Sequence, residues 1–196
     1  MIQYTQKITK DEMAMMPVEV YSGKVVLIDD EKDVPSAIEY LSTRECVGFD
    51  TETRPSFYKG QRHKIALMQI STESVCFLFR LNKIGIPKPL EEFLSNPDVL
   101  KIGLSLRDDF GAIRKRTPVE LVKFLDLQNY VGRFGINEAS LQKIYAILFS
   151  KKISKGQRLT NWEASELTDM QQKYAALDAW ACLIIYNYLN SNDDDE

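Results

Sequence analysis

Short apolar runs alternate along the chain with longer stretches in which apolar residues recur at helical spacing. Apolar runs bounded by turn residues predict strands at 24–29, 45–50, 64–70, 75–79, 99–104 and 122–126. The run Cys46–Phe49 has no polar position, which is typical of a central strand covered on both faces. Amphipathic spacing predicts helices at 11–16, 89–95, 108–115 and 141–148, and Pro35 opens another. This order predicts an α/β fold, a mixed sheet with helices on both faces.

The last predicted helix carries a carboxylate where its apolar face should continue. Thr168-Asp169-Met170-Gln171 matches a capping box and predicts a helix from Asp169 to about Leu189. On this helix Asp178 lies one turn after Tyr174, inside the apolar stripe. A buried carboxylate is costly unless it is paired or binds a metal. Asp178 is therefore a salt-bridge partner, a partly exposed edge residue or a metal ligand.

Two further groups of acids follow predicted strands. Asp50 and Glu52 flank Thr51, so on an extended chain both point to one face. They repel each other unless a cation lies between them, although an ordinary charged strand end, with Arg54 neutralising one acid, has the same pattern. Asp108-Asp109 begins a predicted helix, where the helix dipole alone favours acids.

Acids at a central strand end, at a strand–helix junction and inside a helix stripe can converge on one point. Such a set of hard oxygen ligands requires a divalent metal, and it suits Mg²⁺ or Mn²⁺. Two such ions a few ångströms apart support in-line displacement at a phosphodiester. The residues thus predict metal-dependent phosphoryl chemistry.

Composition and charge narrow the class of protein. Apolar residues make up 44% and charged residues 27%, which excludes a disordered chain. The net charge is −3, and the last four residues contribute −4, so the rest is near neutral and does not predict a strongly basic nucleic-acid surface. A charged N-terminus, the lack of a long apolar run and three scattered cysteines predict a cytoplasmic protein with reduced thiols. We expect a lead-in segment at 1–24, one domain at 25–190 and a disordered acidic tail at 191–196.

Three segments together resemble the exonuclease motifs of the DEDD family, in its tyrosine-containing subgroup: VGFDTET (47–53), KIGLSLRDDF (101–110) and YAALDAW (174–180). The approach TNWEASELTDMQQ (160–172) is similar to ribonuclease D and Werner-type exonuclease domains. The resemblance implies a ribonuclease H-like fold with a mixed five-stranded sheet. It also implies hydrolysis of terminal phosphodiesters from a free 3' end of DNA or RNA, which releases nucleoside 5'-monophosphates.

The resemblance also implies a role for each motif residue. Asp50, Glu52 and Asp178 would hold the ion that activates water. Asp50 and Asp109 would hold a second ion that stabilises the leaving 3' oxygen. Tyr174 would orient or deprotonate the attacking water; with an ordinary pKa near 10, orientation is favoured.

The second motif departs from the family pattern, because Ser105 stands where many members have Asn, four residues before the acid. Asp108 is a rival to Asp109, although register with the family favours Asp109. Thr51 is expected to offer backbone contacts to the 3' end.

Several other residues have two interpretations each. Phe57 and Tyr58 can stack on a terminal base or pack within their loop. The basic stretch 151–158 can contact phosphates or be an ordinary polar loop. His63, the only histidine, is expected to be a solvated loop residue.

Two other functions remain open at this point. The fold can serve as a non-catalytic nucleic-acid-binding or scaffold domain, or as a Mg²⁺-dependent hydrolase of small nucleotides. The complete set of acids and the tyrosine argues against the scaffold. No motif identifies a contact to a 2'-hydroxyl, so DNA and RNA are not distinguished.

Overall fold

A computed structural model describes residues 4–191 of the chain. Within this range six strands form one sheet in the order β1-β4-β3-β2-β5-β6. The strands are β1 (Lys24–Ile28), β2 (Cys46–Thr53), β3 (Ile65–Ser71), β4 (Val75–Phe79), β5 (Leu100–Gly103) and β6 (Phe124–Asp126). Strand β3 is antiparallel to β2 and β4, and the other pairs are parallel. The predicted mixed sheet is confirmed, with β1 added at the edge beside β4 to the five strands that the resemblance implies.

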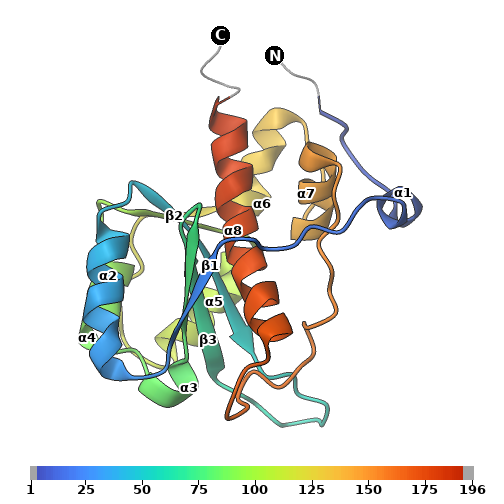
Figure 1. The fold of residues 1–196 in the computed structure, drawn as a ribbon. Coiled ribbons are helices and arrows are strands. Elements are labelled where there is room, and N and C mark those ends of the chain that lie inside the picture. Colours follow the sequence, from blue (N-terminus) through green and yellow to red (C-terminus); the bar gives the residue numbers. More distant parts are fainter. Residues whose placement is uncertain (1–3, 192–196) are drawn as a thin grey trace.

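Helices cover both faces of this sheet, as predicted (Figure 1). One face packs against α2 and α4, and the other against the long helix α8. The helices are α1 (Lys10–Ala14), α2 (Val34–Ser42), α3 (Leu81–Ile84), α4 (Lys88–Leu94), α5 (Leu106–Arg114), α6 (Leu127–Tyr130), α7 (Leu141–Phe149) and α8 (Asp169–Ser191), with short 3₁₀ turns η1 (Glu31–Asp33) and η2 (Val131–Phe134). None of the described helices is long and apolar enough to span a bilayer.

Strand β2 lies inside the sheet, and its side chains alternate between the two covered faces. Val47 and Phe49 are fully buried on the face that α2 and α4 cover. Gly48, Asp50 and Glu52 alternate with them and point to the α8 face. The prediction of a central strand is confirmed, and the strand continues through the acidic motif to Thr53. Both motif acids therefore sit on regular, hydrogen-bonded backbone.

Helix α8 lies directly on the backbone of β2. A Cβ atom at Gly48 would be 2.8 Å from the carbonyl carbon of Ala179 and nearer still to its oxygen. Only glycine allows this approach, because any side chain would push the helix away. The contact places Asp178, the neighbour of Ala179, above Asp50, which is two residues beyond Gly48 on the same face.

The start of α8 is held by the predicted capping box. The Gln171 backbone N–H donates to Thr168 Oγ1 at 3.2 Å, and the Thr168 N–H donates to Gln171 Oε1 at 3.0 Å. Gln171 also donates to the Thr160 hydroxyl at 3.0 Å, which ties the approach loop to the helix. The tail predicted at 191–196 lies outside the described residues apart from Ser191, which ends α8.

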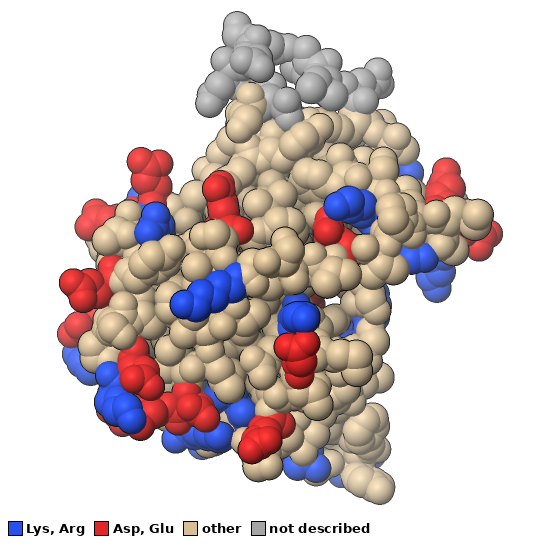
Figure 2. Space-filling model, in the orientation of Figure 1, with Lys and Arg blue, Asp and Glu red and all other residues tan. Residues whose placement is uncertain are grey.

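Charged side chains are interspersed on the surface (Figure 2). Acidic and basic residues alternate on the face shown, with no large area of one sign. The three cysteines are free thiols, as expected.

Candidate active site

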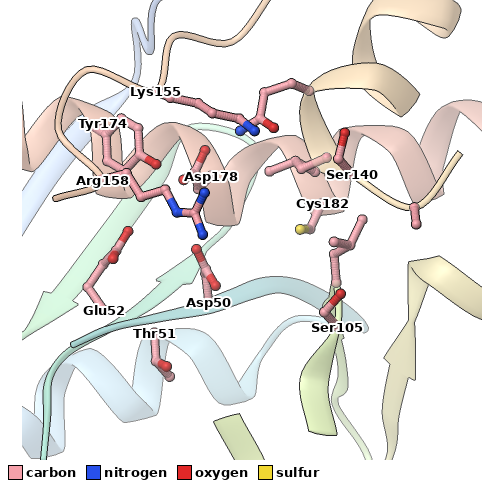
Figure 3. A pocket seen from close by; sticks show the side chains of 14 residues that line it. Asp50, Thr51, Glu52, Ser105, Ser140, Lys155, Arg158, Tyr174, Asp178 and Cys182 are labelled. Atoms are coloured by element: carbon pink, nitrogen blue, oxygen red, sulfur yellow. The ribbon is translucent and has the colours of Figure 1, made fainter. Parts of the chain in front are cut away.

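Three acids from two elements converge at one point. Asp50 and Glu52 on β2 and Asp178 on α8 each offer a carboxylate oxygen, and these oxygens lie within 4.8 Å of one another (Figure 3). We call these residues the acid trio. The shared face predicted for Asp50 and Glu52 is present, and Asp178 is buried and faces them from the helix.

The acid trio cannot carry three negative charges without a counter-ion. Burial, and then the charges of neighbouring acids, raise the pKa of Asp50 well above its usual range and that of Glu52 to about 9. Burial raises the pKa of Asp178 to about 7. Asp178 Oδ1 is buried and has no hydrogen-bond partner in the part of the chain that the structure describes. A hard divalent cation would neutralise the carboxylates and would give Asp178 Oδ1 a partner, so these residues fit a metal site.

Tyr174 lies one turn before Asp178 on α8. Its hydroxyl hydrogen-bonds the Asp178 carboxylate, and its ring packs near that of Trp162, with centroids 6.1 Å apart. Burial, followed by the negative charges of Asp178 and Glu52, raises the pKa of Tyr174 well above its usual range. The hydroxyl therefore stays protonated at neutral pH and acts as a hydrogen-bond donor, in agreement with the orienting role that the sequence favours.

Asp109 on helix α5 lies against β2 on the side of the Thr51 hydroxyl and does not line the cleft with the acid trio. Its carboxylate accepts a hydrogen bond from the Thr51 hydroxyl, and burial raises its pKa to about 6. Its charge raises the pKa of Asp50 and Glu52, although its oxygens are not among those clustered within 4.8 Å. Asp108 is exposed. The arrangement favours Asp109 over Asp108 as the second-motif acid.

The backbone at the start of α5 restricts which residue types suit position 105. Ser105 has a left-handed backbone with φ 60°, a conformation that Asn adopts more easily than most residues. Its N–H and that of Leu106 donate to the two carboxylate oxygens of Asp126 at 2.9 and 3.0 Å. Asp126, at the end of β6, thereby anchors the helix that carries Asp109.

The acid trio lies in a cleft of about 370 Å³. The Thr51 side chain points away from it, so Thr51 contributes only backbone to the lining, and its contact with the 3' end stays a prediction (Figure 3). The cleft is also lined by residues that the sequence analysis did not assign to the site. Among them, residues 139–142 carry no sequence motif that predicts this position. The lining is Asp50, Thr51, Glu52, Leu104, Ser105, Ala139, Ser140, Leu141, Gln142, Lys155, Arg158, Tyr174, Asp178 and Cys182.

Two cations face the acids across this cleft. Arg158 lowers the pKa of Glu52, and Lys155 lowers that of Asp178, against the larger effect of burial. Both come from the basic stretch 151–158, which the sequence analysis left open between phosphate contact and an ordinary loop. The cleft therefore combines oxygen ligands for a cation with positive charge for an anion.

Two other residues singled out in the sequence lie outside the cleft. Phe57 is 72% exposed in the loop between β2 and β3. His63 Nδ1 is 3.3 Å from Glu163 Oε1 and does not line the cleft. The expectation of a non-catalytic histidine agrees with this position, although the side chain is mostly buried and not solvated.

Several known proteins are similar to this chain in sequence. A family described as 3'-5' exonuclease matches residues 25–192. The bifunctional 3'-5' exonuclease/ATP-dependent helicase WRN of Mus musculus is 30% identical over 189 residues, which cover 91% of this chain and 14% of that protein. An Arabidopsis thaliana 3'-5' exonuclease is 30% identical over 154 residues, 76% of this chain and 54% of that protein. The chain thus spans about half or less of the length of these two relatives.

The fold has a close counterpart among solved structures. The EXO domain of Aedes aegypti Nibbler superposes with a TM-score of 0.78 at 22% identity, over 89% of this chain and 92% of that one. At this identity the likeness shows the fold alone, which is the ribonuclease H-like exonuclease fold that the motifs imply. Because the family match covers nearly the whole described chain, including both elements that carry the acid trio, the chain belongs to the 3'-5' exonuclease family.

Proposed function

We propose that the protein is a metal-dependent exonuclease that hydrolyses the terminal phosphodiester at a free 3' end of DNA or RNA and releases nucleoside 5'-monophosphates. The observation that carries this proposal is the acid trio, whose buried Asp178 Oδ1 has no hydrogen-bond partner among residues 4–191. A cleft of about 370 Å³ is near the lower limit of small-molecule sites, so it suits one terminal nucleotide.

Two Mg²⁺ or Mn²⁺ ions are the cofactors that this donor set favours. Asp50, Glu52 and Asp178 would hold one ion, and Asp50 with Asp109 would hold the other. When bound, these ions lower the pKa of the attacking water and neutralise charge on the phosphate and the leaving oxygen.

The chain's own residues supply orientation and charge. Tyr174, protonated and hydrogen-bonded to Asp178, holds the attacking water in place. Arg158 and Lys155 project positive charge into the cleft, where they attract the phosphate of the terminal nucleotide. With Tyr174 in this role, the chain would belong to the tyrosine-containing subgroup. A cytoplasmic location stays a prediction from the sequence.

The test is a gel assay on a 5'-labelled single-stranded oligonucleotide, offered as DNA and as RNA, with Mg²⁺, Mn²⁺ or a chelator. We expect a ladder that shortens from the 3' end, that disappears with chelator and in Asp50→Asn, and that persists in the control Asp108→Asn. Intact oligonucleotide with every metal, or full activity of Asp50→Asn, would overturn the proposal.

The same assay decides between the alternatives. A scaffold has no use for three clustered acids whose pKa values are raised by burial, because their charging destabilises the fold. The cleft size also fits a free nucleotide, so hydrolysis of mononucleotides without cleavage of oligonucleotides would favour the small-nucleotide hydrolase.

A further inference from the structure

The loop between β2 and β3 (residues 54–64) presents two aromatic side chains to solvent. Phe57 is 72% exposed and Tyr58 is 80% exposed. The alternative that these rings pack within their own loop does not agree with this exposure. Adjacent exposed rings of this size are unusual on a soluble protein and indicate a binding surface.

The same loop is strongly basic. Arg54, Lys59, Arg62 and Lys64 lie in a stretch that has no acidic residue between Glu52 and Glu73. The three lysine and arginine side chains from 59 to 64 are exposed, and none forms an ion pair with a described residue. Unpaired positive charge next to exposed rings is the combination that holds phosphates and unpaired bases of a single strand.

The base of the loop is anchored beside the cleft. Both carboxylate oxygens of Glu163 are used: Arg54 Nη1 lies 3.3 Å from Oε2, and His63 Nδ1 lies 3.3 Å from Oε1. One acid thus joins the two ends of the loop and ties them to the segment that leads into α8. We call the part beyond this clamp, residues 55–62, the hairpin arm.

The tip of the hairpin arm is a tight turn. The Gln61 N–H donates to the Tyr58 carbonyl at 3.2 Å, and Gly60 between them has φ +88°, which glycine adopts without strain. The tip projects at the lower edge of the molecule (Figures 1 and 2). The rings are therefore carried on a defined turn whose ends are clamped.

The position of the hairpin arm sets which part of a substrate it reaches. Glu52 lines the cleft and is five residues from Phe57, a distance of at most about 17 Å along extended backbone. This length corresponds to about five stacked nucleotides at 3.4 Å each. The arm lies outside the cleft, so it meets nucleotides behind the terminal one.

We propose that the hairpin arm binds the unpaired nucleotides that precede the 3' end. Phe57 and Tyr58 stack on bases, and Lys59 and Arg62 of the arm, with Lys64 at the base of the loop, contact phosphates. This inference rests on the proposed function for the identity of the ligand. It makes the arm a determinant of substrate length and strandedness, separate from the residues that cleave.

The first test is the preference for a single-stranded 12-mer over a dinucleotide, measured as the ratio of their kcat/KM values. Base stacking on one aromatic ring corresponds to about 5- to 150-fold in affinity, so the ratio should fall by at least that much in the double variant Phe57→Ala/Tyr58→Ala. Met15→Ala, which removes an 88% exposed side chain at the end of α1, is the control and should keep the wild-type ratio. An unchanged ratio in the double variant would refute nucleotide binding by the hairpin arm.

The second test measures binding without cleavage. Fluorescence anisotropy of a labelled 12-mer in chelator should show weaker binding by the double variant. Lys59→Gln/Arg62→Gln/Lys64→Gln should reduce the slope of log K against log salt by about 2, because each phosphate contact on a single strand contributes about 0.7. If these variants lose as much affinity for a blunt duplex as for the single strand, or lose affinity for the duplex alone, the single-strand assignment is overturned.

These measurements separate the two proposals. If no oligonucleotide is cleaved but the double variant loses affinity, the proposed exonuclease activity is wrong and nucleotide binding by the hairpin arm is supported. If cleavage occurs and the affinity of the double variant is unchanged, binding by the hairpin arm is wrong and the exonuclease activity is supported. Equal melting temperatures of the variants and wild type exclude a folding defect as the cause.

Discussion

Replacing Gly48 with alanine should inactivate the enzyme while leaving most of the fold intact. The new Cβ would lie 2.8 Å from the carbonyl carbon of Ala179, where ordinary contact begins at 3.4 Å. The backbone oxygen of Ala179 is closer still, and neither partner is a flexible side chain. Helix α8 must therefore move away from β2 by about 1.5 Å to bring the Ala179 oxygen to van der Waals separation.

This movement acts directly on the acid trio, because Asp178 precedes Ala179 on the displaced helix. Misplacement of a catalytic group by about 1 Å costs on the order of 10²-fold in rate. Overpacking itself costs about 1–3 kcal/mol of unfolding free energy. Activity should therefore fall far more than the melting temperature does.

The assay is single-turnover cleavage of a labelled 12-mer at saturating metal, together with thermal unfolding by circular dichroism. The matched control is Gly132→Ala, because a Cβ at Gly132 meets nothing within 4 Å. The control should keep wild-type rate and stability. A Gly48→Ala enzyme with wild-type rate, or one whose loss of rate is fully accounted for by the unfolded fraction, would refute the claim that this contact sets the geometry of the site.

Three further predictions concern single side chains. Asp109→Ala should abolish cleavage while Asp108→Ala keeps most of it, since Asp109 packs against β2 and its charge raises the pKa of Asp50, whereas Asp108 is exposed; the reverse result would show that the register is wrong. Tyr174→Phe should lower kcat by about 10²-fold with little change in KM, because a positioning donor is lost; a loss confined to KM would contradict this role. Burial lowers the pKa of Lys101, which is fully buried with Nζ donating to a carbonyl at 2.8 Å, to about 8. Between pH 8 and about 10.4 Lys101 is protonated more in the unfolded state than in the folded state, so this side chain should contribute a rise of about 3 kcal/mol in stability across the range. Urea titrations of wild type and Lys101→Met at both ends of this range measure the change in unfolding free energy. An equal rise in the variant would exclude Lys101 as the source.

The sequence predicts the parts of the fold that have strong local signals. The capping box at Thr168 and the apolar run at Cys46–Phe49 locate α8 and β2 to within a few residues. The short helices α3 and α6 and the turn η2 are missed, because each has only four residues and no apolar period can develop in so few.

The candidate site shows the same division. The shared face of Asp50 and Glu52 follows from strand geometry, and it needs no knowledge of the fold. The position of Asp109 depends on how α5 is held by Asp126, which no local pattern encodes. The burial of Lys101 is likewise unpredictable, because a lysine ordinarily indicates a solvated position.

The assembly of the cleft from β2 and α8 has a consequence for the protein during its synthesis. Asp178 follows Asp50 by 128 residues, so a growing chain on the ribosome contains two acids of the trio long before the third. Domains form as their segments emerge, N-terminal parts first. The cleft, and with it any reaction at this site, therefore forms only after α8 has been synthesised and has docked on β2.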